Sequence, residues 1–147
     1  MNLFGTLALT RAVVPHMKAQ GGGAVVFINS MSTRIIEPLA GAYAASKSAL
    51  LTAAQTLAKE LGPHRIRVNS VVPGYIWSEK MAAYFRHLAA QQGTTYEAVK
   101  AEVTARTALL HIPDSDEIAD SVVFFASDLS RVVTGQALDV NGGHYFH

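Results

Sequence analysis

Two short runs of β-branched residues flank a long helical segment, and this order restricts the fold more than any other feature. The runs are AVVFIN (24–29) and IRVNSVV (66–72). Continuous apolar runs of this kind are typical of strands buried on both faces of a parallel sheet. Between them, residues 41–61 are dense in alanine and leucine and are followed by Gly62 and Pro63, which favour a helix end. The sequence therefore predicts a βαβ unit.

Helical spacing predicts further elements on both sides of this unit. Apolar residues recur at helical spacing over residues 2–19, and the glycines of AQGGG then end the helix. Residues 77–112 are helical in pattern but are divided by QQGTT, so we expect two helices in a mobile insertion.

The last third of the chain predicts one more helix and one more strand. Asp114 and Glu117 stand at the spacing of a capping box, which predicts a helix start. ALDV (137–140) predicts a third strand before NGG. Because no repeat or linker marks a second domain, we expect residues 1–147 to form a single α/β domain.

Composition excludes several classes of function. Half of the 147 residues are apolar, which is enough for a core, and a net charge of +1 argues against binding to nucleic acid or to an anionic membrane. No apolar run is long enough to span a membrane, and the opening residues lack the basic region of a signal peptide. The chain has no cysteine, which is compatible with a reducing compartment, so we expect a cytoplasmic location.

A tyrosine four residues before a lysine occurs twice, in YAASK (Tyr43 and Lys47) and in YEAVK (Tyr96 and Lys100). In a helix, the tyrosine and the lysine of each pair would lie on the same face. The spacing alone is a weak signal, because an ordinary surface pair produces it as well.

The residues around each pair favour the first as a site. Ser30 precedes Tyr43 by thirteen residues and stands at the end of a predicted strand, whereas Ala83 precedes Tyr96 by the same distance. After Tyr43, the second strand ends in PGYIWS, which predicts a turn at the edge where α/β folds bind ligands. Ser32 is the nearest alternative to Ser30.

Together, Ser30, YAASK, RVNSVVPGYI and TGQALDVNGG resemble the ordered landmarks of the short-chain dehydrogenase/reductase family. The resemblance covers nearly the whole chain. It implies a partial Rossmann-like, doubly wound parallel sheet, formed by the last three strands of that fold with their flanking helices. It also implies an NAD(P)-dependent oxidoreductase that transfers hydride between a nicotinamide and a small-molecule carbonyl or alcohol substrate.

The resemblance assigns roles to individual residues. Tyr43 would be the acid/base, Lys47 would bind the nicotinamide ribose and favour the phenolate, Ser30 would bind the substrate oxygen, and Asn2 would complete a proton relay. The implied catalytic residues are Asn2, Ser30, Tyr43 and Lys47. The implied cofactor-binding residues are Tyr43, Lys47, Pro73, Gly74, Ile76 and Ser78.

The resemblance extends to the insertion and to assembly. Residues 77–112 match the family's substrate lid, and we expect an apolar lining from Trp77, Met81, Tyr84, Phe85 and Leu88. A homodimer or homotetramer is expected from the helices that the family pairs between subunits. The six histidines lack acidic or cysteine partners at ligand spacing, so no metal site is expected, and HYFH (144–147) is interpreted as a tail.

The family's opening half has no counterpart in this sequence. GGG (21–23) precedes a strand, so it cannot be the glycine-rich turn that holds a dinucleotide pyrophosphate. The choice between NAD and NADP is therefore left open, and residues 24–29 are expected to form an open sheet edge. Two hypotheses follow: the chain is the C-terminal catalytic half of an oxidoreductase, or it is a non-catalytic folding or oligomerisation module.

Overall fold

The computed structural model describes residues 2–146. Every expected helix and strand is present, and the bounds differ from the predictions by a few residues at most. The helices are α1 (Phe4–Ala19), α2 (Gly41–Leu61), α3 (Glu79–Gln92), α4 (Tyr96–Ala105) and α5 (Ser115–Ala126). The strands are β1 (Gly23–Ile28), β2 (Ile66–Pro73) and β3 (Ala137–Val140), and single 3₁₀ turns cover Met31–Thr33, Gly62–His64 and Asp128–Ser130.

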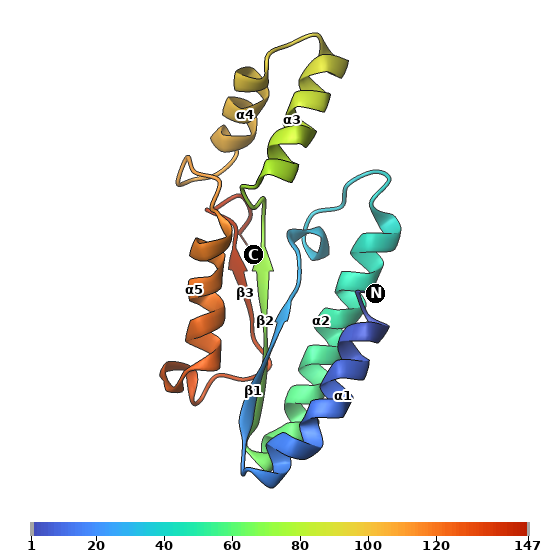
Figure 1. The fold of residues 1–147 in the computed structure, drawn as a ribbon, viewed down its shortest axis with the longest axis vertical. Helices are drawn as coiled ribbons and strands as arrows, with labels where there is room; N and C mark the ends of the chain where they lie inside the picture. Colours follow the sequence, from blue (N-terminus) through green and yellow to red (C-terminus); the bar gives the residue numbers. More distant parts are fainter. Residues whose placement is uncertain (1, 147) are drawn as a thin grey trace.

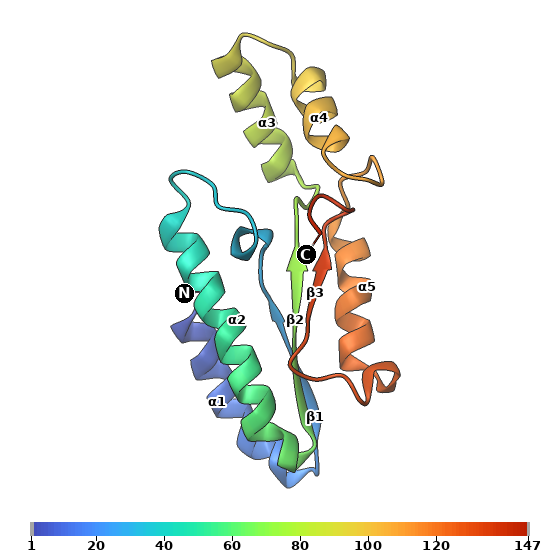
Figure 2. The ribbon, with the colours of Figure 1, turned by 180° about the vertical axis from the view of Figure 1, so that it is seen from behind.

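The three strands form one parallel sheet in the order β1-β2-β3. Helices α1 and α2 cover one face of the sheet and α5 covers the other, as Figures 1 and 2 show from opposite sides. Parallel strands joined by helices on both faces are the doubly wound arrangement. The predicted fold class, a partial Rossmann-like sheet, is confirmed.

Each face of the sheet has its own apolar core. Under α2, Leu50 and Ala54 pack with Phe27 of β1 and Val68 of β2, and all four side chains are buried. Under α5, the buried side chains that pack together are Val71, Ile118 and Phe125. Each large apolar side chain removed from water in these two cores contributes roughly 1.5–3 kcal/mol to the favourable free energy of folding.

Strand β2 is the central strand and carries two polar residues on the face toward α5. The Arg67 guanidinium donates hydrogen bonds to Phe125 O at 2.6 Å and to Ser127 O at 3.1 Å, so it caps the C-terminal end of α5. The Asn69 amide donates to Val133 O at 2.9 Å and accepts from the backbone N–H of Gln136 at 3.0 Å. Polar residues can therefore stand in this buried strand because their hydrogen bonds are satisfied.

Strand β1 differs from the prediction of a strand buried on both faces. Within residues 2–146 it pairs only with β2, and of its side chains only that of Phe27 is fully buried, while Ile28 is 45% exposed. The reason is that no other strand lies beside it, so the expected open edge is present.

Helices α3 and α4, with their connections to the sheet, form what we call the α3–α4 unit (residues 77–112). The unit stands beyond the C-terminal ends of the strands (Figure 1). It has a core of its own, in which the buried side chains are Phe85, Ala89, Val99, Val103 and Ile112. No helix in residues 2–146 combines the length and the apolar character that crossing a membrane requires.

Candidate functional site

Ser30 and Gly74 follow the C-terminal ends of β1 and β2, and the two loops that carry them border one pocket of about 230 Å³. This is the sheet edge at which open α/β folds bind ligands. The pocket is lined by Ser30, Met31, Ser32, Ile35, Glu37, Gly74, Tyr75 and Met81.

The backbone of Ser30 is extended, with φ −161° and ψ 148°, and its side chain caps the short turn Met31–Thr33. Its hydroxyl oxygen accepts a hydrogen bond from the Ser32 amide at 3.2 Å. That contact leaves the hydroxyl hydrogen available to a substrate oxygen in the pocket. Ser32 lines the same pocket, but its own hydroxyl is buried and has no hydrogen-bond partner within residues 2–146.

Tyr43 lies in the first turn of α2, and Lys47 lies one turn later on the same face. The Tyr43 side chain is 44% exposed, and the Lys47 ammonium nitrogen (Nζ) is 5.8 Å from the centre of its ring. Lys47 Nζ also donates a hydrogen bond of 2.8 Å to the carbonyl oxygen of Ile28, the last residue of β1. Helix α2 therefore brings Lys47 to the end of the strand that leads into Ser30, whereas neither Tyr43 nor Lys47 is among the residues that line the pocket.

Glycine is required at position 74 because the chain passes close to the loop after β3. A Cβ atom on Gly74 would lie 2.9 Å from Asn141 Cβ and 3.2 Å from Asn141 Cα, which are too close without a shift of the backbone. Pro73 ends β2 before it, and Ile76 packs against the core under α5. Ser78 caps α3, accepting a hydrogen bond from the Met81 amide at 3.2 Å.

Asn2 is hydrogen-bonded within its own segment of the chain. It precedes α1, is exposed, and accepts a hydrogen bond from the Thr6 hydroxyl through its backbone carbonyl at 3.0 Å. The hydrogen bonds of residues 2–146 include none between Asn2 and either Tyr43 or Lys47.

The second tyrosine and lysine pair, Tyr96 and Lys100, belongs to the α3–α4 unit. The Lys100 ammonium lies over the Trp77 ring, 4.3 Å from its centre. Tyr96 packs against the core of that unit, with the Arg86 guanidinium 6.0 Å from its ring. Both side chains therefore have packing contacts within the α3–α4 unit.

Tyr75 and His144 are two residues of this region that sequence reasoning missed. Their rings stack, with centres 5.7 Å apart and planes inclined at 28°. Burial raises the pKa of Tyr75 and lowers the pKa of His144, and the nearby charge of Arg106 lowers both. Tyr75 stands between Gly74 and Ile76, two residues predicted to bind the cofactor, and this position could have indicated that it lines the pocket. His144 belongs to HYFH, which the sequence analysis interprets as a tail.

Two of the residues expected in the lining of the lid, Met81 and Phe85, have different surroundings. Met81 borders the pocket, whereas Phe85 has 0% exposure and forms the centre of the α3–α4 core. Helical periodicity predicts the apolar face of α3, but it does not predict that α4 packs against that face.

Several of the residues that the resemblance assigns to a nicotinamide lie near one sheet edge, and the glycine run that precedes β1 lies at the other. Ser30, Gly74 and the Lys47 ammonium are all near the C-terminal ends of β1 and β2. Gly21–Gly23 lead into the opposite end of β1, and within residues 2–146 no glycine-rich turn joins a strand to a helix. The described residues contain no group of three or more histidine, aspartate or glutamate side chains that could hold a metal ion.

Comparison with known proteins agrees with this arrangement. A family model described as enoyl-(acyl carrier protein) reductase matches residues 1–145. The (3R)-3-hydroxyacyl-CoA dehydrogenase of Mus musculus is 36% identical, over 97% of this chain and 51% of its own length. The 3-oxoacyl-(acyl-carrier-protein) reductase of Thermotoga maritima is 34% identical, over 97% of this chain and 54% of its own length.

The fold likeness is as extensive as the sequence likeness. The crystal structure of sorbitol-6-phosphate 2-dehydrogenase from Erwinia amylovora superposes with a TM-score of 0.92 and 27% identity, over 99% of this chain and 58% of that chain. The chain spans about half the length of the curated relatives it matches. With the family model matched over nearly every residue, the chain belongs to the short-chain dehydrogenase/reductase family of oxidoreductases.

Proposed function

We propose that this chain is the catalytic half of an NAD(P)-dependent oxidoreductase that transfers hydride between a nicotinamide and a carbonyl or alcohol substrate. The observation that carries the proposal is the grouping of Ser30, Gly74 and the Lys47 ammonium at the C-terminal edge of the sheet. Open α/β folds bind ligands at the C-terminal edge of the sheet.

In this proposal the proton and the hydride move separately. The bound nicotinamide supplies or accepts the hydride. Tyr43 gives a proton to the substrate oxygen or takes one from it, and the Lys47 ammonium lies on the next helical turn, 5.8 Å from the centre of the Tyr43 ring. Ser30 donates a hydrogen bond to the same oxygen and stabilises the charge that develops there.

We propose that Tyr43, Lys47, Pro73, Gly74, Ile76 and Ser78 hold the nicotinamide end of the cofactor. The place of Gly74 in the lining of the pocket, beside Ser30, supports this. We assign Asn2 to the proton relay only by resemblance. The α3–α4 unit, residues 77–112, is proposed as the substrate lid, since Met81 contributes to the pocket. A cytoplasmic location is also proposed.

One observation supports the alternative function, a non-catalytic folding or oligomerisation module. Both outer strands of the sheet formed by residues 2–146 have an open edge, and the same residues contain no glycine-rich turn between a strand and a helix. A folding or oligomerisation module would need no such turn. The two functions differ in one measurable property, which is the reduction of a carbonyl compound.

A chimera tests the proposed function directly. The first half of the Thermotoga maritima reductase, ending where its match to this chain begins, is joined to Asn2. We expect the chimera to bind NADH or NADPH saturably and to oxidise it in the presence of at least one member of a carbonyl panel. The 147-residue chain alone should show no saturable binding in calorimetry. A folded chimera without activity over the panel would refute the proposed function, and tight binding by the chain alone would refute the assignment of half a cofactor site.

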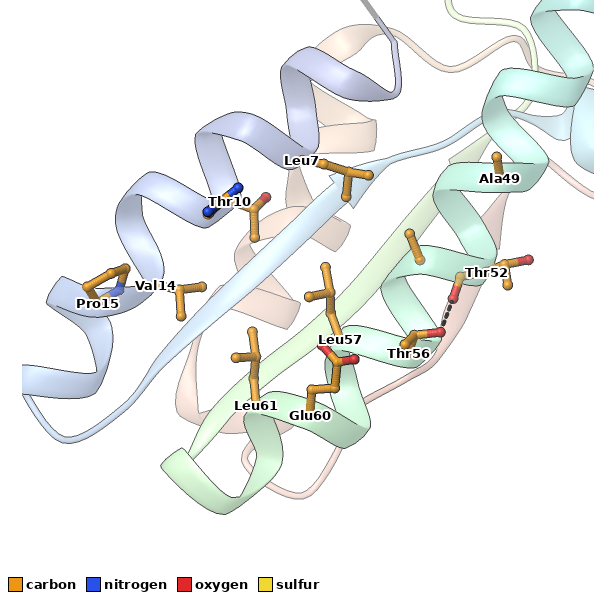
Figure 3. Close-up of a pocket in the computed structure, with 12 residues that line it drawn as sticks. Leu7, Thr10, Val14, Pro15, Ala49, Thr52, Thr56, Leu57, Glu60 and Leu61 are labelled. Carbon is orange, nitrogen blue, oxygen red and sulfur yellow. Dashed lines mark hydrogen bonds between the residues drawn. The ribbon is translucent and has the colours of Figure 1, made fainter.

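We further propose that the chain forms a homodimer or homotetramer through a groove between α1 and α2. The groove has a volume of about 810 Å³, and Figure 3 shows its mostly apolar lining from both helices. Its residues include Leu7, Val14, Ala49, Thr52, Thr56 and Leu57. A second copy would present the same groove, because two-fold symmetric interfaces use one patch twice.

Replacing Ala49 by glutamate adds a charge to this groove. We expect the dissociation constant of the dimer to be about a hundredfold higher than that of the unaltered chain. Sedimentation velocity over a concentration series measures this constant. Ser48→Glu is the matched control, because Ser48 is also exposed on α2 but lies outside the groove. Equal assembly of the two variants would contradict the proposed interface.

A further inference from the structure

The pocket beside Ser30 has one charged group in its lining. Of the residues that line it, only Glu37 has a side chain that is ionised at neutral pH, since the others are serine, methionine, isoleucine, glycine and tyrosine. Glu37 stands between the turn Met31–Thr33 and α2, and its backbone carbonyl accepts a hydrogen bond from the Ala40 amide at 3.3 Å. The segment that carries Ser30 therefore also brings a carboxylate to the pocket.

The carboxylate of Glu37 is available to a ligand. The residue is exposed, and the ion pairs found within residues 2–146 are formed by other side chains. An ionised carboxylate can only accept hydrogen bonds. A molecule in the pocket that binds Glu37 must therefore offer it an O–H or N–H group.

The charges around the pocket decide which donor suits Glu37. Burial raises the pKa of Tyr75 and lowers the pKa of His144, so both rings are uncharged at neutral pH. At these two stacked rings the positive charge of Arg106 has a larger effect than the negative charge of Glu37. A cationic ligand would be repelled at this wall of the pocket, and an anionic ligand would be repelled by Glu37 itself. A neutral donor, which is a hydroxyl, avoids both repulsions.

The volume of the pocket limits the size of the ligand. It is about 230 Å³, which is below the roughly 300–1,000 Å³ of sites for drug-sized molecules. Ser30 and Glu37 both border this small space, so one compact molecule can contact both.

We propose that Glu37 makes the site selective for a compact, neutral, hydroxylated ketone or the corresponding polyol, and selects against substrates that carry a carboxylate. Ser30 binds the reacting oxygen, and a second hydroxyl of the same molecule donates a hydrogen bond to the Glu37 carboxylate. This inference rests on the proposed function, to which it adds the class of substrate.

Three four-carbon ketones test the selectivity in the chimera. Erythrulose carries hydroxyls on its other carbons, butanone carries none, and acetoacetate carries a carboxylate. In Glu37→Gln, the ratio of kcat/KM for erythrulose to that for butanone should fall about threefold to thirtyfold, because a neutral amide is a weaker acceptor than a carboxylate. The ratio for acetoacetate to butanone should rise by about tenfold or more, because the repulsion between like charges is removed.

Asp120→Asn is the matched control for these ratios. Asp120 is an exposed carboxylate on α5 and does not line the pocket. Its replacement should leave both ratios unchanged. An active chimera whose ratios do not respond to Glu37→Gln, or respond equally to Asp120→Asn, would overturn the selectivity and leave the proposed function in place. A folded chimera that is inactive toward every carbonyl compound would remove the function and the selectivity together.

A titration of His144 in the 147-residue chain tests the place of the carboxylate without any activity. Burial and the charge of Arg106 lower the pKa of His144, whereas the charge of Glu37 acts in the opposite direction because it favours the imidazolium. Glu37→Gln should therefore lower the pKa of His144 further, as followed by NMR of the ring protons, and Asp120→Asn should not. An unchanged pKa of His144 in Glu37→Gln would show that the carboxylate does not face the pocket and would overturn the proposal.

Discussion

Replacing Tyr43 by phenylalanine is expected to lower the turnover number of the chimera by about 100-fold to 10,000-fold, the usual contribution of a positioned acid or base. Phenylalanine keeps the ring on α2 but has no hydroxyl to exchange a proton with the substrate oxygen. Because Tyr43 is 44% exposed and stands in the first turn of its helix, the fold should tolerate the change. The rate of NAD(P)H oxidation at saturating substrate measures the effect.

Tyr96→Phe is the matched control. This tyrosine also stands four residues before a lysine, but it packs in the α3–α4 unit and its lysine lies over Trp77. Turnover of this variant should remain within a factor of about three, since its hydroxyl contributes at most an ordinary hydrogen bond. Equal losses in the two variants would show that the first pair has no special role in proton transfer.

Replacing Phe85 by alanine should destabilise the α3–α4 unit by about 3–5 kcal/mol, the typical cost of removing a buried phenylalanine. Phe85 has 0% exposure and contacts the rings of Tyr75 and Trp77 at centre distances of 6.5 and 6.3 Å. Because this core is separate from the two cores of the sheet, the loss should be local.

Hydrogen exchange followed residue by residue measures this local loss. In Phe85→Ala, amides of α3 and α4 should lose protection while those of β2 keep theirs. Tyr84→Ala is the control, since Tyr84 is the preceding residue and its side chain is 52% exposed. Its effect should stay within about 1 kcal/mol. A uniform loss of protection across the sheet in Phe85→Ala would contradict the separate core.

The sequence predicted those features that depend on neighbours along the chain. The capping box is an example: the Asp114 carboxylate accepts from the Glu117 amide at 3.0 Å, and the Glu117 carboxylate accepts from the Asp114 amide at 2.9 Å. The helix over residues 41–61 has the expected bounds for the same reason, because alanine content, Gly62 and Pro63 are all local signals.

What the sequence could not predict depends on contacts between distant segments. Tyr75 and His144 stack across a separation of 69 residues, and nothing near either residue announces the other. The hydrogen bond from Lys47 to Ile28 is of the same kind. Helical spacing placed Lys47 beside Tyr43, but only the packing of α2 over β1 decides which acceptor its ammonium reaches.

The separate core of the α3–α4 unit makes this part of the molecule exchangeable. The unit joins the sheet through the turn after Gly74 and through the segment that enters α5, and it has an apolar core of its own. Its end also contacts the loop after β3, where the Leu109 amide donates a hydrogen bond to Gly142 O at 3.0 Å. A unit of different shape could therefore be grafted between these two junctions without repacking the strands. With the unit as the proposed substrate lid, its replacement would change substrate preference, while the residues that follow β1 and β2 are retained.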